Sequence, residues 1–452
     1  MEIIVCSRSG KPIFQCQLRE KQSCTVDTVD VNQEERCYSS AAFVSSMQGL
    51  LDFVSCTQNQ QLQAIETETL MIRFISTNEL SFAVLRTKQW AKDTLLRVCV
   101  ERLFDLLHGF IQLILTRKGL EILKSSPQYD LRGLLTGTEN TMEQIAYSWF
   151  TCITSRVKHF GFQCVRLASK LRSRITDALI PGLSSTEEPC HLLCGLILSN
   201  EKLVCIVQPR KDLFHLSVDD LILLVAFVYH SKCFQNSESW TPVCLPSFNP
   251  DGFLHAYVYF FDEYTSLILL SSCPLPSQFH IFQAERHRLS AQLDQINAFE
   301  AIDNSRKAYR TWRLQEEIPQ EGLLHFVYKN EQTGECVISP WTTPFESISE
   351  TCKVSHLERY LQLHQRMTYT EGSSRKSQKS QLIGKSLGFG AFHVHCMVLN
   401  DRITLVVALH SEESRLYATF DALCDTLDAK SACKDLCVRL KQDDMLMSAT
   451  LN

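Results

Sequence analysis

The sequence predicts an α+β fold in which one unit, an antiparallel sheet flanked by helices, occurs three times. The observation behind this prediction is the element order hairpin, helix, hairpin, helix, which recurs three times along the 452 residues. The predicted strands are rich in Ile, Val, Phe and Tyr and are bounded by Asn, Gly, Ser or Pro. The predicted helices repeat apolar residues at three- and four-residue steps. Antiparallel hairpins whose faces are covered by helices give a layered unit.

In the first copy, residues 2–6 pair with 13–18 and residues 69–75 pair with 80–86, and a helix follows each hairpin. The apolar residues that predict these helices are Phe43, Met47, Leu50, Leu51 and Val54 in the first, and Leu95, Cys99, Leu103, Leu106, Leu107 and Phe110 in the second.

In the second copy, residues 193–198 pair with 203–207 and residues 254–261 pair with 267–271. Ser217 and Asp220 fit a capping box at the start of its first helix. The proline-rich segment 240–253 is predicted to be an ordered connector that leads into the strand at 254. The apolar residues that predict the two helices are Leu221, Leu224, Val225 and Val228, and then Phe279, Phe282, Leu289, Leu293 and Ile296.

In the third copy, residues 324–328 pair with 336–339 and residues 391–399 pair with 403–410. Capping signals are expected at Ser355 with Glu358, and at Ser411, which precedes two glutamates. The apolar residues that predict the helices are Leu357, Tyr360 and Leu361 in the first, and Leu416, Phe420, Leu423 and Leu427 in the closing helix.

The repeat predicts domains at residues 1–140, 141–300 and 322–452, with a linker at 301–321. A chain of this length is expected to hold about three domains, and units of on the order of 100–140 residues can each bury a core. Residues 301–320 are charged and polar, so they are read as a linker or an extended helix. Residues 372–379 have low complexity and predict a disordered loop.

Composition excludes several classes of protein. The net charge of −5 argues against a general nucleic-acid binder, which needs a basic excess. The N-terminus lacks the positive and apolar regions of a signal peptide, and the apolar run 221–229 is far shorter than a membrane span. We therefore expect a cytosolic protein, in which the 20 cysteines are mostly small buried hydrophobic residues.

Two motifs resemble sites for covalent or phosphate chemistry, but their context does not fit. Residues 384–388 match G-x-S-x-G around Ser386, which requires a strand before it and a helix after it. Here a polar loop precedes the motif and a predicted strand follows it. A phosphate-binding loop would need glycine at the position of Lys379. We expect no catalytic residue, so the protein is predicted not to be an enzyme.

Patterns of His and Cys raise the question of a metal site. His393 and His395 share one face of a predicted strand, whereas Cys396 points to the other face. Cys190 and Cys194, with His191 nearby, and Cys433 with Cys437 have a spacing that structural zinc sites rarely use. We expect neither a metal nor a cofactor.

Two stretches without acidic residues suggest binding to anionic lipid headgroups or to an acidic partner. The alternative is that each is a solvated helix face or loop. The candidate lipid-binding residues are Arg156, Lys158, Arg166, Lys170, Arg172 and Arg174 in the first stretch and Arg375, Lys376 and Lys379 in the second.

Several segments resemble the Mon/SAND vacuolar-fusion family. The most specific is the Trp-Thr-Pro-x-Cys-Leu-Pro-x-Phe-Asn run that starts at Trp240 and leads into the strand ending at Phe261. Four further segments match in order, from the first strand to the third copy. They are residues 7–14, 129–139, 210–215 and 325–329.

The resemblance implies three longin-like domains and a partner subunit of the Ccz type. The pair would act as a guanine-nucleotide exchange factor for a late-endosomal Rab GTPase, in endosome maturation and vacuole or lysosome fusion. It would be cytoplasmic and recruited peripherally to late-endosomal, vacuolar or lysosomal membranes that carry anionic phosphoinositides. The alternative is a longin-domain tether or adaptor without exchange activity.

In the family, the first domains of the two subunits form the GTPase platform. Carried over to the first helix of this chain, this implies the GTPase-binding candidates Phe43, Met47, Gln48 and Leu51, although Phe43 and Leu51 also fit a core role.

Family members usually have a long N-terminal extension, and this sequence begins at the first strand. The low-complexity insertion at 372–379 also departs from the family pattern.

Overall fold

The structure is a computed structural model. It describes residues 1–18, 41–87, 97–180, 190–235, 237–311, 322–341, 349, 352–354, 356–363, 392–399, 402–421 and 423–442. These residues form two compact units. Unit 1 contains Met1–Tyr147 and Cys244–Gly252, and unit 2 contains Ser148–Val243 and Phe253–Asn452.

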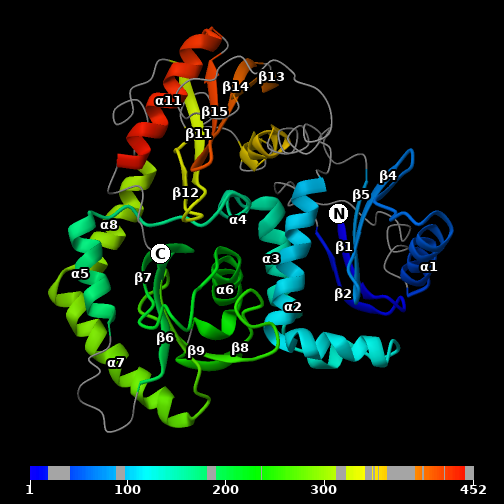
Figure 1. The fold of residues 1–452 in the computed structure, drawn as a ribbon, viewed down its shortest axis with the longest axis horizontal. Coiled ribbons are helices and arrows are strands. Elements are labelled where there is room, and N and C mark those ends of the chain that lie inside the picture. The colour runs from blue at the N-terminus through cyan, green and yellow to red at the C-terminus, as the bar shows by residue number, and fades with distance from the viewer. Residues whose placement is uncertain are drawn as a thin grey trace, which may run out of the picture. The chain divides into compact units, whose positions relative to one another are not determined.

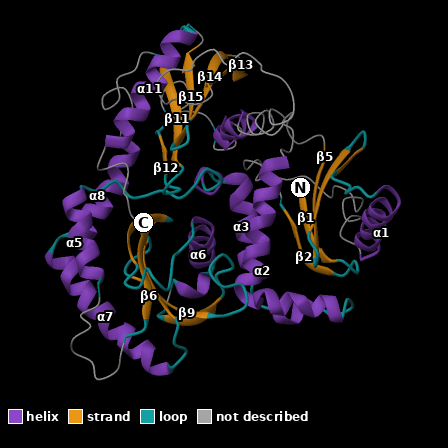
Figure 2. Ribbon diagram, viewed as in Figure 1, coloured by secondary structure: helices purple, strands orange, loops and turns teal. Residues whose placement is uncertain are grey.

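The described residues form three five-stranded antiparallel sheets with the same strand order, so the predicted α+β fold and its threefold repeat are confirmed (Figure 1). In each sheet the hairpin strands come first in the chain, and a three-stranded meander follows. The orders are β2-β1-β5-β4-β3, β7-β6-β10-β9-β8 and β12-β11-β15-β14-β13. Figure 2 shows each sheet with helices beside it.

Unit 1 holds the first sheet between two helices. Its strands are β1 (Glu2–Ser7), β2 (Pro12–Gln17), β3 (Ala64–Glu66), β4 (Leu70–Ser76) and β5 (Leu80–Thr87). Helix α1 (Ala41–Gln58) places Val44, Met47 and Leu51 in a buried cluster with β1, β4 and β5. Helix α2 (Arg97–Ser125) covers the other face, where the rings of Phe82 and Phe104 lie 4.7 Å apart. The 3₁₀ helix η2 (Leu131–Leu134) and α3 (Glu139–Thr151) follow.

Unit 2 contains the second and third sheets. The second sheet has β6 (Leu192–Ser199), β7 (Lys202–Val207), β8 (Ser239–Val243), β9 (Leu254–Phe260) and β10 (Thr265–Ser271). Helices α4 (Ile153–Val157) and α5 (Ser169–Leu179) precede it, and α6 (Val218–His230) and the 3₁₀ helix η3 (Lys232–Phe234) lie between its strands in the chain. Ser217 caps α6 as predicted, because its side chain accepts a hydrogen bond from the Asp220 amide.

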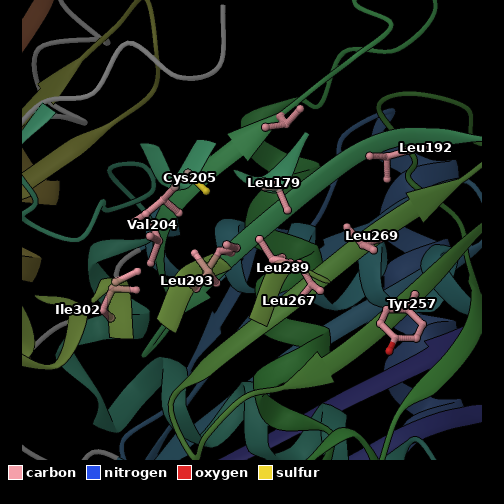
Figure 3. Close-up of a cluster of buried hydrophobic side chains, with 14 of the residues drawn as sticks. Leu179, Leu192, Val204, Cys205, Tyr257, Leu267, Leu269, Leu289, Leu293 and Ile302 are labelled. Atoms are coloured by element: carbon pink, nitrogen blue, oxygen red, sulfur yellow. The ribbon is translucent and has the colours of Figure 1, made fainter. Parts of the chain in front are cut away.

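The core of the second sheet lies under three helices. Leu179 of α5, Leu289 and Leu293 of α7 (Pro276–Gln295) and Ile302 of α8 (Ala298–Thr311) pack against β7, β9 and β10 (Figure 3). Residues 301–311, the start of the stretch read as a linker or an extended helix, therefore belong to helix α8. Residues 312–321 lie outside the described residues.

The third sheet has β11 (Leu323–Asn330), β12 (Cys336–Ile338), β13 (Phe392–Leu399), β14 (Arg402–His410) and β15 (Ser414–Asp421). Helix α11 (Thr426–Gln442) covers one face with Cys433, Leu436 and Leu440. Residues 356–363 are helical, and Tyr360 reaches the other face, where its hydroxyl lies 2.7 Å from that of Thr419.

The predicted closing helix of the third copy is wrong in its position. Leu416 and Phe420 lie on β15, Leu423 follows that strand, and Leu427 is an exposed residue of α11. Leu416 and Phe420 are four residues apart, which suits a helix. However, residues 415–420 are largely buried on both faces of the strand, and such apolar runs cannot be told from helix by periodicity. Ser411 lies in the β14–β15 turn, where it accepts a hydrogen bond from the Ser414 amide, so it caps no helix.

The sequence prediction also missed one strand in each of the first two sheets. β3 has only three residues. β8 lies in the segment read as a connector, and its Pro242 is tolerated because β8 is an edge strand. The domain boundaries at 140, 300 and 321 stay predictions, because the two compact units do not separate the second sheet from the third.

Candidate functional surfaces

The four GTPase-binding candidates lie on the side of α1 that faces the first sheet. Met47 and Leu51 are buried in the core, and Phe43 packs against that core while half-buried. Gln48 is also buried, and its side-chain amide donates a hydrogen bond of 2.9 Å to Asp52. These side chains hold α1 in place more directly than they offer a surface to a partner.

The outward side of α1 carries two apolar side chains that the sequence analysis did not select for binding. Leu50 is 41% exposed and Phe53 is 64% exposed, and they lie one helical turn apart. The exposed residues between and beside them, Ser46 and Gly49, carry no charge. One sequence pattern could have indicated this face. It is an apolar pair beside small uncharged residues, on a helix whose single charged residue is Asp52.

A cavity of about 100 Å³ lies in unit 1 between the end of α1, β4 and the start of α2. Leu51, Phe74 and Val100 supply the apolar part of its wall. Arg8 and Arg73 supply positive charge, and Glu101 supplies negative charge. Arg8 forms an ion pair of 3.2 Å with Asp52. These charged side chains argue against a purely apolar ligand.

Three of the six cations in the first basic stretch are buried and bound within unit 2. Arg156 is 1% exposed, lies against the rings of Trp149 and Phe150, and forms an ion pair of 3.0 Å with Glu358. Because Glu358 belongs to the helical residues 356–363, this pair ties α4 to the third sheet's layer.

The side chains of Lys158 and Arg172 bind to groups in or next to the second sheet. The Lys158 ammonium lies 2.7 Å from the carboxylate of Glu201 in the β6–β7 turn. Burial alone would raise the pKa of Glu201, but the charges of Lys158 and His230 outweigh it and hold that pKa below its usual value. The Arg172 guanidinium donates hydrogen bonds of 2.7 and 2.8 Å to the carbonyls of Val204 and Val165.

These contacts divide the first basic stretch into two groups. Arg156, Lys158 and Arg172 are not available to a lipid headgroup in this conformation, and Arg166 is half-buried. Lys170 and Arg174 are exposed on α5. The six residues therefore do not form one exposed basic surface. The second set, Arg375, Lys376 and Lys379, lies outside the described residues.

Residues 160–165, called the strap from here on, hydrogen-bond to the edges of both sheets of unit 2. On one side, the Phe162 amide donates to the Gly334 carbonyl (3.2 Å) and the Cys336 amide donates to the Phe162 carbonyl (2.7 Å). On the other side, Val165 and Gln163 exchange hydrogen bonds of 2.8 Å with Leu203 of β7. The strap therefore makes a hydrogen-bonded connection from β7 to β12.

The most specific family segment, at 240–253, has two parts. Residues 239–243 form β8 in unit 2, whereas Cys244–Gly252 belongs to unit 1. The Cys244 amide donates to the Leu113 carbonyl of α2 (2.9 Å), and the Arg117 amide donates to the Pro250 carbonyl (2.7 Å). Residues 244–253 therefore follow an ordered path, as predicted for the connector, whereas residues 240–243 form a strand that the prediction did not include.

The remaining sequence candidates lie on separate elements or outside the described residues. Ser386 lies outside the described residues, and the backbone of His393 and His395 lies on β13. Cys433 and Cys437 are buried on α11, and Cys190 precedes β6, which contains Cys194. Among the residues that the structure describes, no group of three or more His, Cys, Asp or Glu side chains could hold a metal ion, and no helix is long and apolar enough to cross a membrane.

Comparison with known proteins adds two family matches. The model of the first longin domain of FUZ, MON1 and HPS1 matches residues 1–145, and the model of the second longin domain of these proteins matches residues 190–289. The matched residues contain the strands of the first and second sheets, and α1, α2, α6 and most of α7.

Curated relatives from plants, fungi and animals match more of the chain. The vacuolar fusion protein MON1 homolog of Arabidopsis thaliana is 27% identical over 364 residues, which cover 75% of this chain and 54% of that protein. Vacuolar fusion protein MON1 of Yarrowia lipolytica is 27% identical over 326 residues (68% and 56%). The MON1 homolog A of Homo sapiens is 27% identical over 368 residues (79% and 50%). The chain thus spans about half the length of these relatives.

Proposed function

The chain belongs to the longin-domain family of FUZ, MON1 and HPS1, as its resemblance to the Mon/SAND proteins predicts, and we propose that it acts in membrane traffic to the vacuole or lysosome. The observation that carries this proposal is the match of proteins named vacuolar fusion protein MON1 to two-thirds or more of this chain.

Within that role, we propose that the chain is one subunit of a guanine-nucleotide exchange factor for a late-endosomal Rab GTPase. Its partner would be a Ccz-type subunit that is also built of longin domains. An exchange factor forms no covalent bond. It binds the nucleotide-free GTPase more tightly than the loaded one, and this difference in affinity drives release of the nucleotide. Such a protein needs surfaces rather than a catalytic cluster, and a repeated sheet-and-helix unit supplies surfaces.

The outward side of α1 supports a location for the GTPase. Leu50 and Phe53 offer apolar area without a competing charge, whereas Met47, Gln48 and Leu51 fix the helix against the first sheet. Phe43, which is half-buried, lies between these two roles. We therefore propose that Leu50 and Phe53 contact the GTPase or the partner's first domain, and that Met47, Gln48 and Leu51 act by positioning α1.

The test is release of a fluorescent GDP analogue from a panel of Rab GTPases, with this chain and the Ccz-type subunit purified together. We expect one late-endosomal Rab to lose GDP at least tenfold faster with the complex than without it. Phe53→Ser should reduce this acceleration. Leu134→Ser, which replaces another exposed apolar residue of unit 1, is the matched control and should not reduce it.

If no Rab on the panel responds while the complex still binds one of them, the protein is a tether or adaptor rather than an exchange factor. If Phe53→Ser leaves exchange unchanged, α1 is not the contact, although the exchange function itself would stand.

A further inference from the structure

Helix α2 is broken at Thr116, where the backbone has φ 63° and ψ 168°. A β-branched residue at positive φ is a genuine outlier and persists only where its surroundings hold it. Thr116 is buried, so neighbouring groups surround it. The ribbon of α2 changes direction along its length (Figure 1).

The break opens the helical hydrogen bond between Arg117 and Leu113, and beside it the Thr116 hydroxyl accepts a hydrogen bond from the Gly119 amide (3.4 Å). In an unbroken α-helix the Arg117 amide would donate to the Leu113 carbonyl, four residues earlier. Here the Leu113 carbonyl accepts from the Cys244 amide at 2.9 Å, and the Arg117 amide donates to the Pro250 carbonyl at 2.7 Å. Both halves of the lost hydrogen bond are thus satisfied by the same segment, Cys244–Gly252, which we call the wedge.

Further contacts fix the wedge in this position. The Arg117 guanidinium makes two hydrogen bonds to the Asp251 carboxylate, one of them 2.9 Å long. Cys244 and Leu245 are almost fully buried, and the Leu245 carbonyl accepts hydrogen bonds from the Phe248 and Asn249 amides. The wedge is therefore a compact turn that inserts as one piece.

The inserted state has one more backbone hydrogen bond than the released state, and the strain at Thr116 opposes this gain, which allows two states. In the inserted state the wedge supplies two backbone hydrogen bonds and an ion pair, but Thr116 is strained. In the released state α2 regains the hydrogen bond from Arg117 to Leu113 and Thr116 loses its strain. The Arg117–Asp251 pair is partly exposed, so it adds only modestly to the inserted state.

We propose that the wedge and the break in α2 form a two-state device, in which release of Cys244–Gly252 lets α2 become continuous. β8 ends at Val243 and β9 begins at Leu254, so both ends of the wedge continue directly into strands of the second sheet. Helix α2 is a layer of the first sheet. The device therefore links the shape of α2 to the β8–β9 connection. This inference does not depend on the proposed exchange activity.

Hydrogen exchange of two backbone amides in the full chain tests the proposal. The Arg117 amide is bonded in both states, to Pro250 when the wedge is inserted and to Leu113 when it is released. The Cys244 amide is bonded only when the wedge is inserted. A shift to the released state must therefore speed exchange at Cys244 and leave Arg117 protected, whereas local unravelling of α2 would expose both amides.

Three variants are expected to shift the equilibrium between the inserted and released states. Thr116→Leu favours the continuous helix, because leucine has a high helix propensity and avoids positive φ, and it should speed Cys244 exchange by about tenfold. Asp251→Asn removes the ion pair and should act in the same direction. Thr116→Gly relieves the strain of the break and should slow Cys244 exchange. Asp130→Asn is the matched control, because Asp130 pairs with Arg132 in the same unit without touching the wedge.

Two outcomes would overturn the proposal. One is a Cys244 amide whose exchange is the same in all of these variants. The other is a rise in Arg117 exchange that accompanies the rise at Cys244. If Thr116→Leu does not fold, the opposite shifts expected for Thr116→Gly and Asp251→Asn still decide the question.

Discussion

At the scale of single residues, the structure shows that several cations of the predicted basic surface are buried in ion pairs or hydrogen bonds. Arg156 and Lys158 lie in a stretch without acids, yet their partners, Glu358 and Glu201, come from other parts of the chain. A count of local charge cannot detect such partners, because they are brought near only by the fold. The exposed cations of the stretch, Lys170 and Arg174, remain candidates for binding.

A second residue-scale feature is a buried polar cluster in the third sheet's layer. His325 and His356 are almost fully buried, and both approach the Tyr360 hydroxyl, at 3.0 and 3.2 Å. The ring of Trp341 stacks on that of His325, with 3.9 Å between centroids. Burial, aided by the charge of Arg359, lowers the pKa of His356 to about 3, and burial followed by the charge of His356 lowers the pKa of His325 well below its usual value.

These shifts predict that unit 2 loses stability as the pH falls below 6.5, the ordinary pKa of a histidine side chain. Both histidines are neutral in the folded protein, whereas in the unfolded chain they gain protons near that ordinary pKa. The unfolded state then binds more protons, so the free energy of unfolding decreases on acidification by up to about 1.4 kcal/mol per pH unit for each histidine. This contribution is fully present above pH 6.5. For His356 the loss continues down to about pH 3.

The measurement is denaturant unfolding of the wild type and of His356→Gln at pH 7, 6 and 5. His230, whose pKa is lowered to about 4, titrates in the same direction, so the difference between the two proteins is the relevant quantity. We expect a shallower pH dependence in the variant. Equal slopes would show that His356 does not enter the folded state neutral.

At the scale of elements, local pattern predicted most strands and helices, including fully buried strands such as β6 and β10. α1, α6 and α7 show clear helical spacing and were found near their positions, whereas β15 was read as a helix. The strands β3 and β8 were not predicted, because β3 is very short and β8 contains proline. None of the contacts of the strap has a sequence signal, because they depend on which sheet edges meet.

The strap predicts a large effect for one small substitution. A Cβ atom on Gly161 would overlap the Gly334 carbonyl oxygen, so Gly161→Ala must displace the strap from β12. We expect a loss of roughly 2–4 kcal/mol in the free energy of unfolding of unit 2, as for other strained or broken backbone contacts. Denaturant unfolding measures this loss.

Gly49 provides the comparison, because nothing lies within 4 Å of a Cβ added there. It lies within α1, where alanine is favoured over glycine, so Gly49→Ala should stabilise unit 1 by about 0.5–1 kcal/mol. If Gly161→Ala proves as harmless as Gly49→Ala, the strap does not hold β12 in the way described.

At the scale of the whole molecule, the threefold repeat and the family resemblance could be inferred from sequence, and the proposed binding surfaces could not. The repeat depends on hydrophobic periodicity, which is local. The sides of α1 that face the core and the solvent, the burial of Arg156 and the insertion of Cys244–Gly252 depend on contacts between distant residues. The sequence candidates on α1 are therefore residues of its core-facing side, and the exposed Phe53, which we propose as a contact, is not among them.

The last prediction concerns recruitment to membranes. We expect the proposed complex to bind anionic vesicles that contain phosphatidylserine and phosphatidylinositol 3-phosphate, and we expect Lys170 and Arg174 to contribute. Each cation near an anionic surface adds about 1 kcal/mol of attraction, so neutralising both should weaken binding by up to roughly 30-fold at low salt. Raising the salt concentration should shrink the difference, because exposed charges are screened over about 8 Å at physiological ionic strength.

The buried cations make the design of this experiment specific. Neutralising Arg156, Lys158 or Arg172 would disturb unit 2, so a loss of binding in those variants would not identify a lipid contact. Lys170→Gln with Arg174→Gln is the informative pair, and Lys118→Gln with Arg439→Gln removes the same charge from exposed positions elsewhere. Equal loss in both pairs would indicate a response to net charge alone. If neither pair changes vesicle binding while Arg375, Lys376 and Lys379 together do, recruitment belongs to the second basic stretch and α5 is only a solvated helix.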